Sequence, residues 1–396
     1  MNVQKSVTGT SEDIVYLDHA ATSWPKPPAV LEAVHYALAH ESANPGRGSH
    51  RMAVQASRTL LKARQQLARL LDVRNPVDIA FTANTTVALN MAIFGYVRAG
   101  DHVVATMTEH NSVWRPLEAL KRSMGVEVTY VPVNAKGQLE LHEVEQAFTA
   151  RTRLLICNHS SNLLGSILPV AELAQLAHRH GARILLDIAQ SAGHIPVKLQ
   201  EWEIDMAAFP GHKGLLGPQG TGGLYIAPDL DLTPWLYGGT GSQSEEANQP
   251  SVRPDRYEPG TPNTPGIAGL AAGVQYVLQQ GIEAIAAHEQ QLVIRLINGL
   301  SDINGLRILG PAAGEPRTGI VSFVMEQQDP AQIAFILDRQ YGIAVRAGMH
   351  CTPLAHRIAG TLATGAVRTS VGYGTTEQHI DHLLEAVQFI QRTANV

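Results

Sequence analysis

The sequence predicts an α/β protein in which helices cover a mostly parallel sheet, followed by a smaller α+β domain. Strand-like apolar runs alternate with helical runs through the first two-thirds of the 396 residues. Such alternation is typical of parallel sheets. A Pro- and Gly-rich stretch at residues 237–265 interrupts the pattern, and two long helical stretches follow it. The length and this interruption suggest two or three domains.

Each element follows from the local pattern. Residues 54–71 carry apolar side chains at helical spacing, and Asn84, Thr85 and Thr86 open a second helical run over 87–96. The expected strands of the sheet are residues 101–107, 126–133, 154–157, 183–187, 205–209 and 222–226. A helix over 171–180 ends at Gly181, a suitable C-cap. The later part contains expected helices at 266–280, 282–300 and 376–392, and expected strands at 319–325 and 343–345.

Composition and charge exclude several function classes. Hydrophobic residues make up 44% of the chain and the formal net charge is −5. The chain can therefore fill sizeable cores, and nothing favours a nucleic-acid or membrane-surface partner. No apolar run reaches the roughly 18 residues of a membrane helix, and residues 1–13 lack the apolar core of a signal peptide. Two cysteines cannot build a disulfide framework. We expect a soluble cytoplasmic protein.

Lys213 is the clearest candidate for chemistry. It follows the expected strand 205–209, and Asp187 ends the expected strand 183–187. In open α/β sheets, ligands bind beyond the carboxyl ends of the strands. Pyridoxal 5′-phosphate (PLP) chemistry requires a lysine amine that binds the aldehyde covalently and a carboxylate that keeps the pyridine nitrogen protonated. The alternative for the lysine alone is a solvated surface group.

Other polar groups fall at similar positions. Thr85 and Thr86 lie at a helix N-terminus, which can hold a phosphate, although an ordinary N-cap explains them as well. His110 follows the expected strand 101–107 and can stack on an aromatic ring, or it is an ordinary loop histidine. Asn162 and Gln190 can hydrogen-bond a ring oxygen, or they satisfy only the backbone.

Several segments together resemble the class V aminotransferase superfamily, which has PLP fold type I. They are 16–22 (YLDHAAT), 108–110 (TEH), 161–165 (SNLLG), 186–190 (LDIAQ) and 211–213 (GHK). Residues 346–351 (RAGMHC) narrow the resemblance to cysteine desulfurases and selenocysteine lyases of the Suf type. The resemblance implies a large PLP-binding domain at 28–262 with a mostly parallel seven-stranded sheet. Residues 1–27 and 263–396 would form a small domain that carries the Cys351 loop.

The resemblance also implies a role for each matching residue. Lys213 would bind the cofactor aldehyde, Asp187 would pair with the ring nitrogen, and His110 would stack over the ring. Gln190 and Asn162 would contact the phenolic oxygen of the cofactor, and Thr85, Thr86 and His212 would contact its phosphate. Thr261 would contact the phosphate bound by the partner subunit. Arg368 and Asn162 would contact the substrate. Cys351 would be the nucleophile that becomes a persulfide. Arg346 and His350 are expected to lie near the substrate. Both flank Cys351, where a cation would favour the thiolate, although an arginine there can equally be a structural pair for an acid.

Three positions depart from the family pattern. Pro210 stands where a Ser or Thr usually donates to the phosphate, Met349 replaces a frequent histidine, and Gly374 replaces a frequent asparagine. None touches the residue that binds the aldehyde. The departures therefore bear on cofactor affinity and substrate preference and leave the reaction class unchanged.

The resemblance implies a homodimeric cysteine desulfurase that converts L-cysteine to L-alanine and passes the Cys351 persulfide to an acceptor protein, as in iron–sulfur cluster assembly. One alternative is a selenocysteine lyase, which would act on L-selenocysteine with the same residues. Another is a C–S lyase that releases pyruvate, and a third is a non-catalytic PLP-binding protein. No metal is expected, because the spacing of His350, Cys351 and His356 fits no known zinc site. Cys157, inside an expected strand, is predicted to be an inert buried thiol.

Overall fold

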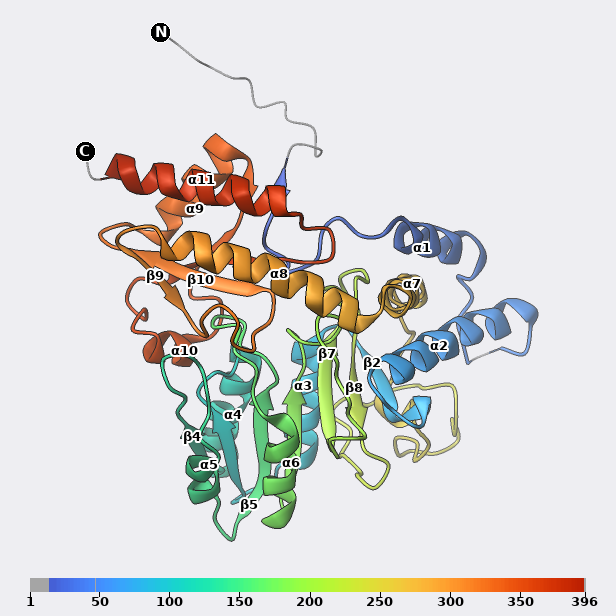
Figure 1. Cartoon of the computed structure of the whole chain (residues 1–396). Helices are drawn as coiled ribbons and strands as arrows, with labels where there is room; N and C mark the ends of the chain where they lie inside the picture. Colours follow the sequence, from blue (N-terminus) through green and yellow to red (C-terminus); the bar gives the residue numbers. More distant parts are fainter. Residues whose placement is uncertain (1–13, 47, 395–396) are drawn as a thin grey trace.

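Two β-sheets, each with its own apolar core, organise the chain (Figure 1). The structure is a computed structural model and describes residues 14–46 and 48–394, so the expectation about residues 1–13 lies outside the described residues. The larger sheet has seven strands in the order β2-β8-β7-β6-β5-β3-β4. Within it, β8 is antiparallel to both of its neighbours and the other pairs are parallel. The predicted α/β class is confirmed.

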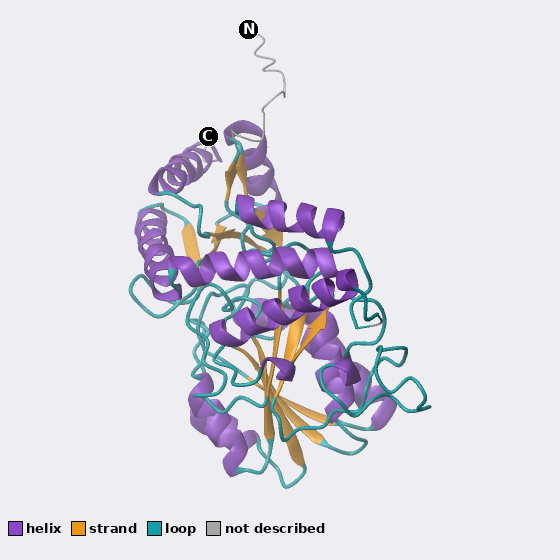
Figure 2. Ribbon diagram, turned by 90° about the vertical axis from the view of Figure 1, so that its right-hand side faces the viewer, coloured by secondary structure: helices purple, strands orange, loops and turns teal. Residues whose placement is uncertain are grey.

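Strands β3, β7 and β8 of the larger sheet are buried along their whole length, as expected for inner strands covered on both faces, whereas the edge strand β4 is partly exposed. The bounds of the seven strands are Ile79–Thr82 (β2), His102–Thr106 (β3), Glu127–Val131 (β4), Thr152–Asn158 (β5), Arg183–Asp187 (β6), Met206–Pro210 (β7) and Gly222–Ile226 (β8). The helices of this part are α1 (Pro28–His40), α2 (Arg51–Leu70), α3 (Thr85–Tyr96), α4 (Asn111–Met124), α5 (Leu141–Ala147) and α6 (Val170–Arg179). Figure 2 shows these strands at the centre with helices around them. One cluster of buried residues joins the strands with α3, α4 and α6.

The smaller sheet lies in the C-terminal part of the chain. Its four antiparallel strands are β9 (Leu306–Leu309), β10 (Ile320–Met325), β12 (Arg346–Gly348) and β13 (Ala366–Ser370). The helices of this part are α7 (Thr264–Gln280), α8 (Ile282–Ser301), α9 (Pro330–Tyr341), α10 (Pro353–Ile358) and α11 (Glu377–Ala394). Apolar residues of α8, α9 and α11 share a core with this sheet, whereas α7 contributes Leu270 and Val274 to the core of the larger sheet.

The N-terminal segment joins the C-terminal part. β1 (Val15–Tyr16) pairs in parallel with β11 (Ile343–Ala344), and Leu17 lies in the core of the smaller sheet. The assignment of residues 1–27 and 263–396 to a small domain stays a prediction. Among the described residues, no helix combines the length and apolar character needed to cross a bilayer.

Candidate active site

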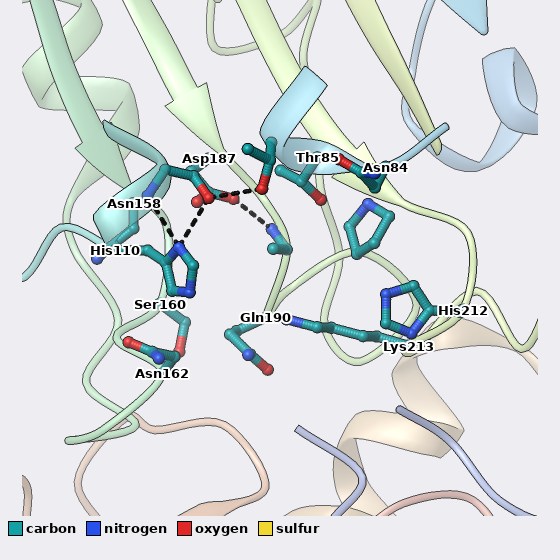
Figure 3. A pocket seen from close by; sticks show the side chains of 14 residues that line it. Asn84, Thr85, His110, Asn158, Ser160, Asn162, Asp187, Gln190, His212 and Lys213 are labelled. Atoms are coloured by element: carbon teal, nitrogen blue, oxygen red, sulfur yellow. Dashed lines mark hydrogen bonds between the residues drawn. The ribbon is translucent and has the colours of Figure 1, made fainter. Parts of the chain in front are cut away.

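A cavity of about 120 Å³ lies at the carboxyl ends of β3, β5, β6 and β7 (Figure 3). This is the edge at which open α/β sheets bind ligands. Eight residues that the sequence singled out line it, namely Thr85, Thr86, His110, Asn162, Asp187, Gln190, His212 and Lys213. Asn84, Ser112, Asn158, Ser160, Ala189 and Pro210 complete the lining. The structure therefore brings together residues as far apart in the chain as Asn84 and Lys213, which are 129 positions apart.

Lys213 and Asp187 form the reactive end of the cavity. Figure 3 shows the Lys213 side chain extending into the cavity that Asp187, Gln190 and His110 border. Burial lowers the pKa of Lys213 to about 8, although the Asp187 carboxylate opposes this shift. Burial raises the pKa of Asp187, and the backbone N–H of Ala189 donates to its Oδ1 at 2.9 Å. An amine with this pKa is partly unprotonated near neutral pH, and a buried carboxyl favours a cation placed against it.

The first turn of α3 also lines the cavity. The Asn84 side chain caps this helix by accepting from the backbone N–H of Val87 at 3.0 Å. Thr85 and Thr86 follow in the first turn, where free N–H groups and the helix dipole favour an anion. The geometry of this helix start therefore fits both alternatives, an ordinary N-cap and a phosphate-binding site. His212 lies here as a neutral ring, because burial and Lys213 lower its pKa to about 4.

His110 is fixed by the helix that it begins. Its side chain caps α4, accepting at Nδ1 from the backbone N–H of Ser112 at 3.0 Å. Burial lowers the pKa of His110 to about 4, and the charge of Lys213 adds to this shift. The ring is thus neutral near pH 7, with its proton on Nε2. Its predicted stacking on a cofactor ring stays a prediction.

Glu109 is a buried acid whose burial could not be inferred from the sequence. Its Oε1 accepts from Thr106 Oγ at 2.5 Å and from the backbone N–H of Asn158 at 2.9 Å, while Oε2 is buried without a partner. Burial raises the pKa of Glu109 to about 8, and the nearby Asp187 adds to this shift. Asn158, whose backbone N–H binds Glu109, pairs with Asp187 across β5 and β6, so β5 lies between the strand that Glu109 follows and the strand that Asp187 ends. Glu109 is therefore a neutral carboxylic acid at pH 7.

Replacing Glu109 with glutamine should flatten the pH dependence of stability. Unfolded glutamate has a pKa of about 4.3, and the folded value is raised to about 8. The folded state thus holds the proton more tightly, so this contribution is complete below about pH 4 and is lost as the pH rises through 8. Between pH 5 and 9, the free energy of unfolding of Glu109→Gln should rise relative to wild type by up to about 4 kcal/mol. Parallel pH profiles from urea unfolding of the two proteins would contradict a proton on Glu109.

Cys351 lies on a tight turn between β12 and α10. His350 and Cys351 both have left-handed backbone angles, with φ of 49° and 59°. Such conformations are strained for residues other than glycine and persist where the surroundings hold them. The backbone N–H of Asn111 donates to the Cys351 carbonyl at 2.8 Å, and Asn162 Nδ2 donates to the His350 carbonyl at 2.6 Å. The turn is thus fastened to the rim of the cavity.

The sequence predicted a positive charge on His350, and this prediction is wrong. Burial lowers the pKa of His350 to about 3, and its ring stacks on His356 with centroids 5.6 Å apart. The ring is neutral because burial and the positive charge of Arg368 disfavour its cation. Arg346 is the cation that contacts the thiol, with Nη2 3.9 Å from Cys351 Sγ. No group of three or more His, Cys, Asp or Glu in the described part of the chain is placed to hold a metal ion.

Arg368 connects the cavity with the small sheet. It is 1% exposed on β13, donates through Nη1 to the Asn162 carbonyl at 3.0 Å, and pairs through Nη2 with Asp18 at 2.9 Å. Its Nε and the Asn162 side-chain oxygen are buried without partners. Buried polar atoms are costly when unpaired. One unpaired donor and one unpaired acceptor suit the carboxylate and the ammonium of an amino acid.

Five of the predicted site residues are not among those that line the cavity, namely Thr261, Arg346, His350, Cys351 and Arg368. Thr261 is exposed, and its Oγ accepts from Asn44 Nδ2 at 3.3 Å. Its contact with a partner subunit stays a prediction. Cys157 is fully buried on β5, as predicted, and burial raises its pKa. The lining residues Asn158 and Ser160 were missed, although both follow a predicted strand end, the rule that identified Asp187.

Comparisons with known proteins agree with this geometry. The chain matches the family described as aminotransferase class-V over residues 15–383. It is 35% identical over 397 residues to a cysteine desulfurase of Synechococcus elongatus. The alignment covers 98% of this chain and 62% of that longer protein. It is 37% identical over 386 residues to a probable cysteine desulfurase of Methanothermobacter thermautotrophicus, with 96% and 95% coverage. A solved apo cysteine desulfurase of Thermococcus onnurineus superimposes with a TM-score of 0.91 and 32% identity over 96% of each chain. Because the family match includes both Lys213 and Asp187, this chain belongs to the aminotransferase class-V family.

Proposed function

We propose that this chain is a PLP-dependent cysteine desulfurase that converts L-cysteine to L-alanine and keeps the sulfur as a persulfide on Cys351. The position of Cys351 carries this proposal. Its thiol lies beside Arg346 on a turn that Asn162 hydrogen-bonds, and Asn162 lines the cavity that contains Lys213. The names of the similar proteins support the same activity. Assignment to the Suf type is a further part of the proposal.

The lining of the cavity fits PLP. The amine of Lys213 suits the aldehyde, the Asp187 carboxyl suits the ring nitrogen, and the start of α3 suits the phosphate. In this proposal His110 would contact the ring face, and Gln190 and Asn162 would contact the phenolic oxygen. Thr85, Thr86 and His212 would contact the phosphate. When bound, PLP supplies the electron sink that allows the substrate α-carbon to lose a proton.

Residues of the chain carry out substrate binding, proton transfer and sulfur transfer. Arg368 holds the substrate carboxylate, and Arg346 contributes positive charge beside the reacting thiol. Lys213, whose pKa is lowered to about 8, accepts the α-proton as a general base. Cys351 Sγ then attacks the substrate sulfur. The new S–S bond forms as the Cβ–S bond breaks, and the electron pair of that bond stays on the carbon skeleton, which is protonated and leaves as alanine.

Product analysis tests this function. PLP-loaded protein incubated with L-cysteine and a thiol reductant should form one alanine for each sulfide released, and no pyruvate. Pyruvate and ammonia in place of alanine would overturn the desulfurase and establish a C–S lyase. The same assay with L-selenocysteine compares kcat/KM for the two substrates and decides between a desulfurase and a selenocysteine lyase, which would use the same residues.

A homodimer belongs to the same proposal. Apolar side chains of α1 and α2 are exposed, including Leu31, Tyr36, Leu38, Met52 and Leu61. These helices and α7 also border a cavity of about 470 Å³. Such exposed apolar surface is typical of protein interfaces. A sulfur-acceptor protein, a role in iron–sulfur cluster assembly and a cytoplasmic location complete the proposal.

The dimer predicts a contribution of Thr261 to cofactor binding by the partner subunit. Sedimentation should give a dimer, and Thr261→Ala should lower PLP affinity by about threefold to tenfold, the value of one hydrogen bond. Asn44→Ala removes the contact of Thr261 within its own subunit and serves as the control. A fully active monomer at low protein concentration would contradict the shared site.

A further inference from the structure

The side chain of Ser112 lies between the side chains of Thr86 and His110, which both line the cavity. Its Oγ is 2.7 Å from Thr86 Oγ and 2.9 Å from His110 Nδ1. These contacts are drawn as dashed lines beside His110 in Figure 3. Ser112 is 8% exposed, lines the cavity and occupies the first turn of α4. Three polar side chains from two helix starts thus form one chain of hydrogen-bonding groups.

Counting hydrogens limits the arrangements of this chain. A hydroxyl has one hydrogen, and His110 Nδ1 already accepts from the Ser112 backbone N–H at 3.0 Å. Nδ1 therefore has no hydrogen to donate to Ser112. The Ser112 hydroxyl hydrogen can point to only one of its two neighbours at a time. If it points to His110, the Thr86 hydroxyl donates to Ser112. If it points to Thr86, the Thr86 hydrogen is released toward the cavity.

A bound phosphate selects between these arrangements. The dianion of a phosphate monoester only accepts hydrogen bonds, so Thr86 can serve it only as a donor. Thr86 must then accept from Ser112, and a hydroxyl that accepts a hydrogen bond becomes a stronger donor. His110 keeps its orientation because the backbone N–H of Ser112 still holds Nδ1.

We propose that Ser112 is a positioning residue for the cofactor phosphate, whose hydroxyl turns from His110 to Thr86 when the phosphate binds. Ser112 does not itself touch the phosphate in this arrangement. It makes Thr86 a donor and leaves the His110 ring free to remain in place. The inference rests on the proposed PLP-dependent function.

Comparison of PLP with pyridoxal, which lacks the phosphate, tests this role. Both aldehydes react with Lys213, so that contribution is common to the two titrations. Ser112→Ala should lower the affinity of the apo protein for PLP by about tenfold, the size expected for a bond in a charged network. Its affinity for pyridoxal should stay within about twofold. Ser112→Thr, which keeps the hydroxyl, should restore PLP binding.

A double-mutant cycle shows whether Ser112 acts through Thr86. In a Thr86→Val background, Ser112→Ala should reduce PLP affinity by less than about twofold. Ser123→Ala is the control, because Ser123 is exposed on the same helix and donates to Ala119. Equal losses for PLP and pyridoxal, or additive losses in the cycle, would overturn the inference while leaving the proposed function intact. A wild-type protein that binds no PLP would overturn both.

Discussion

Lys213→Ala is expected to abolish turnover of L-cysteine while leaving the fold intact. Lys213 has two tasks in the proposed mechanism, because it binds the cofactor covalently and moves the α-proton. Loss of the general base alone costs about 10²–10⁴-fold in rate, and loss of the covalent link adds to this. Burial lowers the pKa of the lysine to about 8, so the wild-type amine is reactive near neutral pH. Alanine formation measured with PLP-saturated protein checks the prediction.

Lys26 provides a matched control for Lys213. Burial also lowers the pKa of Lys26 to about 8, and its Nζ donates to Ser23 Oγ at 2.7 Å and to the His212 carbonyl at 2.8 Å. It does not line the cavity. Borohydride reduction followed by mass spectrometry should place the pyridoxyl group on Lys213. A pyridoxyl group on Lys26 would show that a low pKa near the site, rather than a position in the cavity, selects the lysine.

The sequence predicted the parts of the fold in which local pattern and burial agree. The expected strands 183–187 and 222–226 coincide with β6 and β8, which are short apolar runs buried in the sheet. The prediction omitted β2, Ile79–Thr82, a four-residue strand at the edge of the sheet. Its position depends on antiparallel pairing with β8, more than 140 residues later, and no local periodicity reports such a pairing.

The candidate site also contains residues that local pattern predicts and contacts that only the folded chain reveals. Lys213 and Asp187 could be predicted because strand ends converge at one edge of a parallel sheet. The Arg368–Asp18 ion pair spans 350 residues, so only the folded chain reveals it. The neutral state of His350 could not be predicted either, because sequence shows its cationic neighbours and not its burial. Protonation states depend on desolvation, and desolvation depends on tertiary packing.

Cys351→Ser is expected to bind L-cysteine normally and to lose desulfuration. Lys213, Asp187 and Arg368 remain in this variant, so the absorbance of bound PLP should still change when cysteine is added. The serine hydroxyl is not ionised near neutral pH and cannot hold a sulfur atom as a persulfide. Alanine formation should therefore fall by a factor of about 10³ or more.

Cys157 is the control that separates the two thiols of the chain. It is fully buried on β5, and burial raises its pKa, which disfavours the thiolate. Cys157→Ala should keep most of the activity. Alkylation and digestion after treatment with cysteine should place the extra sulfur on Cys351. Extra sulfur on Cys157, or normal alanine formation by Cys351→Ser, would leave the proposed persulfide without support. The two thiols are expected to differ because of their positions in the fold. Of the two, only Cys351 combines partial exposure, a contact with Arg346 and a turn hydrogen-bonded to the cavity wall.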